Sequence, residues 1–162
     1  MIIVSNTTPL IAFSSLQQFD LLRQLFGKVY IAEAVYCEAT VAKKEKDNLG
    51  YEIAQADWIY PVKVKDRLAV AVLLDELDLG EAETIVLAKE LNADWVLMDE
   101  KKGRRKLTQL ELQKIGTLGL LLKAKEIGLL SEIKSAINKL NTVGFNLSDS
   151  VINLVLEQAN EL

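Results

Sequence analysis

Short runs of β-branched and apolar residues alternate with longer segments of helical spacing along the chain. The short runs predict buried strands, and the longer segments predict helices. Strands are expected at residues 2–5, 29–31, 95–98 and 113–116, with 62–64 either a further strand or an extended connection. Helices are expected from Thr8 onward and at about residues 33–42, 80–91, 117–127, 130–140 and 149–160. Strands separated by helices indicate an α/β fold, with a parallel sheet, right-handed crossovers and helices on both faces.

Signals at the helix ends support these boundaries. Thr8 followed by Pro9 is typical of an N-cap with proline at the first helical position. Thr117 and Ser148 are the expected caps of two later helices, and Gly128 is an expected stop. In parallel sheets of this type, ligands bind beyond the carboxyl ends of the strands. Polar residues that directly follow a strand are therefore the first candidates for function.

The composition favours one globular domain over residues 1–162, because the chain is 50% hydrophobic, 26% charged and of single-domain length. No uninterrupted apolar run approaches the roughly 20 residues of a membrane span. The apolar N-terminus lacks the basic flank of a signal peptide. The single cysteine, Cys37, cannot pair within the chain, which fits a reducing compartment. We therefore expect a cytoplasmic protein that does not enter a membrane.

The sequence contains no histidine, and this excludes several kinds of chemistry. Ser-His-Asp and Cys-His nucleophilic sites need an imidazole, and so do many zinc sites. Any bound metal must have oxygen ligands, and Mg²⁺ or Mn²⁺ suits such ligands. A nucleotide-binding site of the Rossmann or Walker A type is disfavoured, because neither glycine-rich motif is present.

Three carboxylates and one carboxamide are candidates for a site at the strand ends. Asn6 and Asp99 each follow an expected strand, and Glu100 comes directly after Asp99. Glu38 lies beside the apolar stripe of its helix, where a charge is costly unless it is paired or bound to a metal. These residue types supply the oxygen ligands that a hard cation needs.

Each acidic candidate also has a purely structural explanation. Glu38 could be a boundary residue whose carboxylate reaches water, and Asp99 could simply form a turn. Glu81 and Glu83 could be acids of a first helical turn that complement the helix dipole. The run KKGRRK at 101–106 could be one solvated face of a helix.

The order of several motifs nevertheless resembles the PIN-domain family of metal-dependent ribonucleases, most closely the prokaryotic PIN-like proteins related to the VapC toxins. In chain order, these motifs are SNTTPLI, EAVYCEA, GEAETIVLA, VLMDEKKGRR, GTLGLLLKAKEIGLL and GFNLSDSVINLVL. The similarity extends over nearly the whole chain. It implies a three-layer α/β/α sandwich with a short parallel central sheet, and an acidic pocket that binds Mg²⁺ or Mn²⁺.

The resemblance also implies roles for individual residues. The catalytic residues would be Glu38, Glu81 and Asp99. The metal ligands would be Asn6, Glu38, Glu81, Asp99 and Glu100, with Thr7, Glu83 and Thr117 in auxiliary roles. Water activated by the metal would attack a phosphodiester in line. The cations that would hold the phosphate backbone of RNA are Lys101, Lys102, Arg104 and Arg105.

Asn6 stands where many members of the family have Asp, and two hypotheses follow. The first is a divalent-metal-dependent ribonuclease, the toxin of a toxin–antitoxin pair, which an antitoxin protein blocks at the acidic pocket. The second is a PIN-like module that binds RNA or a protein, and is catalytically weak or inactive because the neutral Asn6 replaces an acidic ligand. The resemblance, together with the apolar segment 118–122, also makes a homodimer an expectation.

Overall fold

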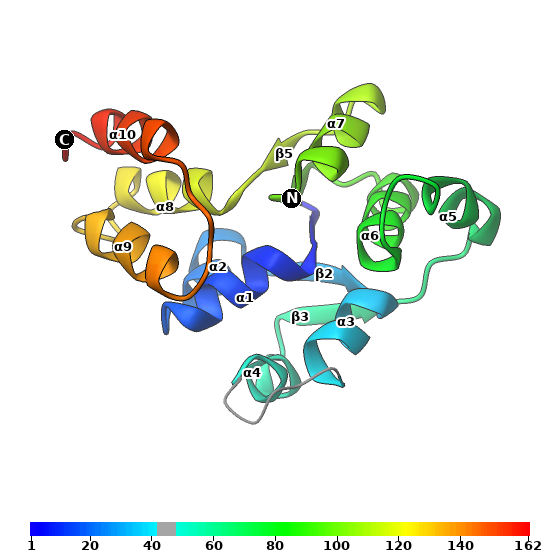
Figure 1. Cartoon of the computed structure of the whole chain (residues 1–162). Coiled ribbons are helices and arrows are strands. Elements are labelled where there is room, and N and C mark those ends of the chain that lie inside the picture. Colours follow the sequence, from blue (N-terminus) through cyan, green and yellow to red (C-terminus); the bar gives the residue numbers. More distant parts are fainter. Residues whose placement is uncertain (42–47) are drawn as a thin grey trace.

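The centre of the molecule is a five-stranded parallel sheet, seen in a computed structural model that describes residues 1–41 and 48–162 (Figure 1). The strands are β1 (Ile3–Ser5), β2 (Val29–Ala32), β3 (Ile59–Val62), β4 (Trp95–Leu97) and β5 (Lys114–Ile115). They pair in the order β3-β2-β1-β4-β5, which makes β1 the central strand. All three residues of β1 are buried, as expected for a strand with helices on both faces.

Helices connect the strands and flank the sheet. They are α1 (Thr7–Ser15), α2 (Asp20–Phe26), α3 (Glu33–Thr40), α4 (Leu49–Gln55), α5 (Arg67–Leu73), α6 (Leu79–Glu90), α7 (Lys101–Gln109), α8 (Thr117–Glu126), α9 (Lys134–Thr142) and α10 (Asp149–Gln158). The connections through α1–α4 and those through α5–α7 run in opposite directions across the sheet, so right-handed crossovers put them on opposite faces. The predicted three-layer α/β/α sandwich with a short parallel sheet is confirmed (Figure 1).

The chain changes direction across the sheet between β1 and β4. The path from β1 leads to β2 on one side, whereas the path from β4 leads to β5 on the other. The two strands are direct neighbours, and the backbone N–H of Asn6 donates to the carbonyl of Leu97 at 2.9 Å. The carboxyl ends of such neighbouring strands leave a crevice where ligands bind in open α/β sheets.

Helix α6 is more deeply buried than the neighbouring helices α3, α5 and α7. Its apolar residues lie on several faces, and Ala82, Ile85, Leu87 and Ala88 are all buried. The helix contacts β1, β2, α3, α5 and α7. Its first turn is thereby fixed against the strand ends.

Several predicted boundaries are confirmed. The expected strands 2–5, 29–31, 95–98 and 113–116 correspond to β1, β2, β4 and β5. Ser148 caps α10 by accepting from the N–H of Val151 at 3.3 Å. Helix α8 ends before Gly128, whose φ of 85° lies in the left-handed region that glycine adopts without strain.

Other boundaries were wrong. Asn6, not Thr8, is the N-cap residue of α1, and Gly116, not Thr117, holds that position in α8. The strand expected at 62–64 is β3, which ends at Val62. The helix expected from residue 130 begins at Lys134, and the short helices α2, α4 and α5 had no expected counterpart. The predicted end of α3 at residue 42 lies outside the described residues.

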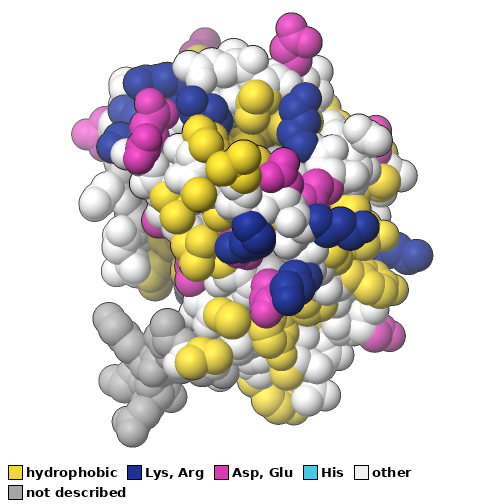
Figure 2. Space-filling model, turned by 90° about the vertical axis from the view of Figure 1, so that its right-hand side faces the viewer, with side chains coloured by type: hydrophobic (Ala, Val, Ile, Leu, Met, Phe, Trp, Pro, Cys, Tyr) yellow, Lys and Arg dark blue, Asp and Glu magenta, His cyan; other side chains and the backbone are white. Residues whose placement is uncertain are grey.

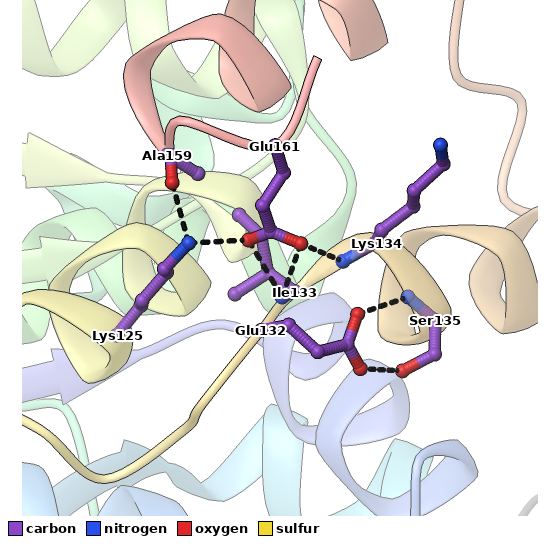
Figure 3. Close-up of polar contacts among 7 residues, drawn as sticks. All are labelled: Lys125, Glu132, Ile133, Lys134, Ser135, Ala159 and Glu161. Atoms are coloured by element: carbon purple, nitrogen blue, oxygen red, sulfur yellow. Dashed lines mark hydrogen bonds and ion pairs between the residues drawn. The ribbon is translucent and has the colours of Figure 1, made fainter.

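Hydrogen bonds to the carboxylate of Glu161 hold the helices α8, α9 and α10 together (Figure 3). This carboxylate accepts from the N–H groups of Ile133 and Lys134 at the start of α9, at 2.9 and 3.0 Å. It also accepts from Lys125 of α8 at 2.9 Å, and the same ammonium group donates to the carbonyl of Ala159. Burial raises the pKa of Glu161, but these hydrogen bonds outweigh it and hold that pKa below its usual value. Within the described residues, no helix is long and apolar enough to cross a membrane.

Candidate functional site

Polar side chains from four elements gather at the carboxyl ends of β1 and β4. Asn6 follows β1, and Asp99 and Glu100 follow β4. Glu38 comes from α3 and Glu81 from the first turn of α6, two helices that pack against each other. The crevice between the two central strands therefore receives residues that are far apart in the sequence.

Glu100 is held from both sides by residues at the start of α1. One carboxylate oxygen, Oε2, accepts from Asn6 Nδ2 at 3.0 Å. The other, Oε1, accepts from the hydroxyl of Thr8. Thr8 can make this contact because it lies inside the first turn of α1 and not at its N-cap.

Glu38 reaches from α3 to the first turns of α1 and α6. Its Oε2 accepts from Thr7 Oγ1 at 2.7 Å. The backbone N–H of Gly80 also donates to the carboxylate, and this N–H is one of those that the first turn of a helix leaves without an intrahelical partner. Although part of the Glu38 side chain is exposed, its carboxylate is thus fixed at the site.

Glu81 is engaged in a capping box at the start of α6. The N–H of Glu81 donates to Asp78 Oδ1 at 2.8 Å, and Glu81 Oε1 accepts from the N–H of Asp78 at 3.0 Å. Glu81 therefore both caps the start of α6 and lies beside the other acids. Asp78 adds a further carboxylate to the group.

Asp99 is bound to the N-terminus of α8. Its Oδ1 accepts from the N–H of Thr117 at 2.7 Å, and its Oδ2 accepts from Thr117 Oγ1 at 2.6 Å. Arg104 is nearby, where its Nη1 donates to the carbonyl of Met98 at 2.8 Å. Gly116 leaves room for the carboxylate, because a Cβ at that position would lie 2.8 Å from Asp99 Oδ1.

The charges of Asp78 and Glu100 contribute to raised pKa values of neighbouring acids. Burial is the largest cause that raises the pKa of Glu38, and the charges of Asp78 and Glu100 raise it further. The same three causes raise the pKa of Glu81. Burial also raises the pKa of Asp99, and Glu100 adds to it, against the lowering effect of Thr117. Glu100 is thus the common electrostatic neighbour of all three, and the cluster carries more negative charge than its environment favours.

Glu83 lies apart from this cluster. Its Oε1 accepts from the N–H of Ala34 at 2.9 Å, and its Oε2 pairs with Arg67 at 2.8 Å. It joins α6 to α3 and α5. A cavity of about 410 Å³ adjoins it, lined by Glu33, Ala34, Cys37, Glu38, Lys63, Arg67, Leu79 and Glu83.

The basic run forms the first two turns of α7, directly after Asp99 and Glu100. Lys101, Lys102 and Arg105 are exposed, whereas Arg104 is half-buried against the strand end. Lys102 and Arg105 line a small cavity of about 210 Å³ together with Asp75, Glu76 and Lys106. On the face that carries α5, Lys and Arg side chains lie among exposed hydrophobic side chains, with Asp and Glu side chains interspersed (Figure 2).

The donor set fits a hard dication, because it consists of carboxylate and amide oxygens with no histidine. The side chains as they stand are, however, each held by protein donors. In residues 1–41 and 48–162, no three Asp, Glu or Cys side chains are grouped so that they could hold a metal ion. Metal binding would therefore use the remaining lone pairs of these oxygens or a change of rotamer.

One member of the cluster, Asp78, was not among the sequence candidates, and Arg104 was expected only as a contact for the RNA backbone. Asp78 could have been found from the D-x-x-E spacing that it forms with Glu81, since this spacing is typical of a capping box. The inward position of Arg104 carries no comparable signal, because all the cations of its run have similar neighbours in the sequence.

The fold defines an α/β protein with carboxylate and amide side chains at the switch point of a parallel sheet. A family model described as "PIN domain" matches residues 2–161. The chain therefore belongs to the PIN domain family, a superfamily whose members are generally nucleases and typically use divalent metal ions. The resemblance to the PIN-domain family, which the motifs indicated, is confirmed. A search of curated proteins finds no match to the chain.

Proposed function

We propose that this PIN domain is an endoribonuclease that depends on Mg²⁺ or Mn²⁺. The observation that supports it is that Glu38, Glu81, Asp99 and Glu100 surround one switch point, where the charge of Glu100 contributes to the raised pKa of each of the other three. Carboxylates whose pKa is raised by a neighbouring negative charge are stabilised when a dication joins the group. Clustered, partly buried carboxylates cost free energy unless they are paired or bound to a metal.

The chemistry of phosphodiester hydrolysis matches this donor set. A bound dication activates water and offsets the charge that builds on the phosphate oxygens. In this proposal Glu38, Glu81, Asp99 and Glu100 hold the cation. Thr7 and Thr117 keep two of these carboxylates in place through their hydroxyl groups.

RNA is the proposed substrate, and α7 is the proposed contact with its backbone. Lys101, Lys102 and Arg105 are exposed on the helix that begins directly after Glu100. Phosphates bound by these cations would lie close to the carboxylates. Arg104 has a different role in this proposal, since its guanidinium group faces Met98 and Asp99 and supports the site from within.

The test is cleavage of a labelled RNA by the purified protein with Mn²⁺ or Mg²⁺. The wild type is expected to cleave, and Glu38→Gln and Asp99→Asn are expected to abolish cleavage. Glu126→Gln, an exposed acid on α8, is the matched control and should keep full activity. Equal cleavage by the wild type and Glu38→Gln would reject the proposal, because the activity would then come from a contaminant.

A second candidate function is a non-catalytic module that binds RNA or a protein. Two observations favour it: Asn6 is neutral, and each carboxylate of the cluster is already paired with protein donors. It would be supported if the wild type cut no RNA under any metal condition and Asn6→Asp gained activity. Cleavage by the wild type would exclude it.

We further propose that the protein is the cytoplasmic toxin of a toxin–antitoxin pair, in the manner of VapC-like proteins. Leu68 and Val72 of α5 are 76% and 65% exposed and offer an apolar surface for an antitoxin or for a second copy of the chain. Co-expression with the product of a neighbouring gene should relieve growth arrest if an antitoxin exists. Light scattering of the purified protein measures whether it is a homodimer.

A further inference from the structure

Asn6 turns its amide nitrogen toward the acidic cluster. The side chain is only 3% exposed, and its Nδ2 donates to Glu100 Oε2 at 3.0 Å and to Met98 Sδ at 3.4 Å. Its Oδ1 lies on the other side, 3.5 Å from the hydroxyl of Thr84, which can donate to it. The opposite amide orientation would bring Oδ1 against the Glu100 carboxylate, where neither group has a hydrogen to donate.

We propose that Glu100 supplies the acidic metal ligand that a residue after β1 would otherwise provide, and that Asn6 is a positioning residue which orients Glu100 by hydrogen bonding. This inference rests on the proposed function, because it assigns roles within the same metal site. In this proposal the negatively charged ligand is Glu100, the residue after Asp99, and not the residue at the end of β1. The site therefore keeps an acidic ligand although Asn6 is neutral.

An amide at position 6 can donate to Glu100, whereas a carboxylate there would repel it unless a cation joined the two groups. An Asp at this position would place a second negative charge about 3 Å from Glu100 Oε2, judged from the Asn6 contact, and like charges this close cannot both ionise readily. The amide removes this repulsion and fixes one carboxylate oxygen. Thr8 fixes the other.

The two hydrogen bonds leave Glu100 able to bind a cation. Each carboxylate oxygen has two lone pairs, and each has one of them engaged by a protein donor. Donors that hold a ligand in this way set its orientation, and their removal typically weakens metal binding about 10- to 100-fold. An Asn6 that ligated the metal itself would instead need Oδ1 to turn away from Thr84.

A double-mutant cycle in Mn²⁺ affinity tests the inference, with titration calorimetry on the wild type, Asn6→Ala, Glu100→Gln and the double variant. Asn6→Ala alone is expected to weaken Mn²⁺ binding about 10- to 100-fold. In the Glu100→Gln background it should change the affinity less than about threefold, because the group that it positions is gone. Equal losses in both backgrounds would overturn the inference and make Asn6 an independent ligand.

Thr8→Val decides the case if Glu100→Gln binds no Mn²⁺ or if Asn6→Ala fails to fold. It removes the second donor to Glu100 and leaves Asn6 intact, so it too should weaken Mn²⁺ binding about 10-fold or more. Thr108→Val, whose hydroxyl contacts only the carbonyl of Arg104 among the described residues, is the matched control and should leave the affinity unchanged. Unchanged affinity in Thr8→Val would overturn the inference.

The same experiment separates this inference from the proposed function. A wild type that binds no Mn²⁺ overturns both. A wild type that binds Mn²⁺ and cleaves RNA, but loses affinity equally on Asn6→Ala in both backgrounds, overturns only the role assigned to Asn6. Circular dichroism of each variant reports its fold independently of activity.

Discussion

The carboxylate of Glu38 occupies the space that a side chain at Gly80 would fill. A Cβ on Gly80 would contact Oε1 directly and would lie 3.0 Å from Cδ and 3.2 Å from Oε2 of Glu38. Gly80 is the second residue of α6, and its N–H donates to the same carboxylate. The absence of a Cβ is thus what lets α3 bring its acid against the N-terminus of α6.

Gly80→Ala should change the geometry of the site without lowering the stability of the fold. Alanine favours a helix by about 1 kcal/mol over glycine, so the fold should be retained, while the Glu38 carboxylate is displaced. We expect Mn²⁺ affinity to fall about 10-fold by calorimetry. Gly119→Ala in α8 is the matched control, since its Cβ would meet only the Ile115 side chain. Unchanged affinity in Gly80→Ala would show that Glu38 does not ligate from this position.

Thr117→Val should destabilise the protein by about 1.5–3 kcal/mol, the range for a hydrogen bond to a charged group. Thr117 is buried, and its hydroxyl donates to Asp99 Oδ2 at 2.6 Å. Urea unfolding measures the change. The exposed Thr108→Val should alter the free energy of unfolding by less than about 0.5 kcal/mol. A loss of similar size in the two variants would argue against a special bond to Asp99.

Acidification should stabilise the metal-free protein near the site. The raised pKa values of Glu38, Glu81 and Asp99 mean that the folded state binds more protons than the unfolded state between the usual and the raised values. Their contribution to the free energy of unfolding therefore rises as the pH falls through that window. Saturating Mn²⁺ should reverse the trend, with about 2.7 kcal/mol of stabilisation at 100 times its Kd at neutral pH.

Thermal unfolding between pH 4 and 8, with and without Mn²⁺, measures this effect. Glu38→Gln should flatten the metal-free profile, because one of the charges that oppose folding is removed. Glu126→Gln should leave the profile as in the wild type. A wild-type profile that rises steadily from pH 5 to pH 8 without metal would contradict the assignment.

The contribution of Glu161 to the free energy of unfolding should depend on pH in the opposite direction to that of the acidic cluster. Its pKa is lowered in the folded state, so its contribution is fully present above the usual Glu value of about 4.3 and is lost as the pH falls through the lowered value. Glu161→Gln should remove this acid-dependent loss and lower the melting temperature at pH 7. Glu157→Gln on the exposed side of α10 is the control. An equal loss of melting temperature at low pH in the wild type and in Glu161→Gln would contradict this role of Glu161.

The exposed cations of α7 should act on affinity for RNA without base preference. Lys101→Gln, Lys102→Gln and Arg105→Gln should each weaken binding to single-stranded RNA and lower the slope of log K against log salt by about 0.7. Lys139→Gln on α9, which is equally exposed, is the control. Fluorescence anisotropy at several salt concentrations provides the slope. An unchanged slope would place the RNA on another face.

The sequence predicted most of the sheet because β1, β2 and β4 are apolar runs with clear ends. It did not predict α2, α4 and α5, since each has only seven residues and helices this short depend on tertiary packing. Thr8 was misassigned as a cap because Pro9 was taken as the first helical residue, whereas it is the third. One shifted position changed the partner of the hydroxyl from the backbone to Glu100.

The site candidates Asn6, Glu38, Glu81, Asp99 and Glu100 could be selected from strand ends, helix faces and the family resemblance. Their hydrogen-bond partners could not be predicted, because those contacts depend on rotamers and on residues up to 94 positions away. Glu83 shows the limit of spacing arguments: it is two residues from Glu81, yet it faces Arg67 and the start of α3.

The pairing of β1 with β4 also sets when the molecule becomes complete during translation. Asn6 leaves the ribosome early, but its partner Glu100 and Thr117, which binds Asp99, follow about 94 and 111 residues later. Contacts of such long sequence separation form late, because closing the chain between them costs entropy first. For the proposed ribonuclease, this order means that the acidic cluster is complete only after nearly three quarters of the chain has been made.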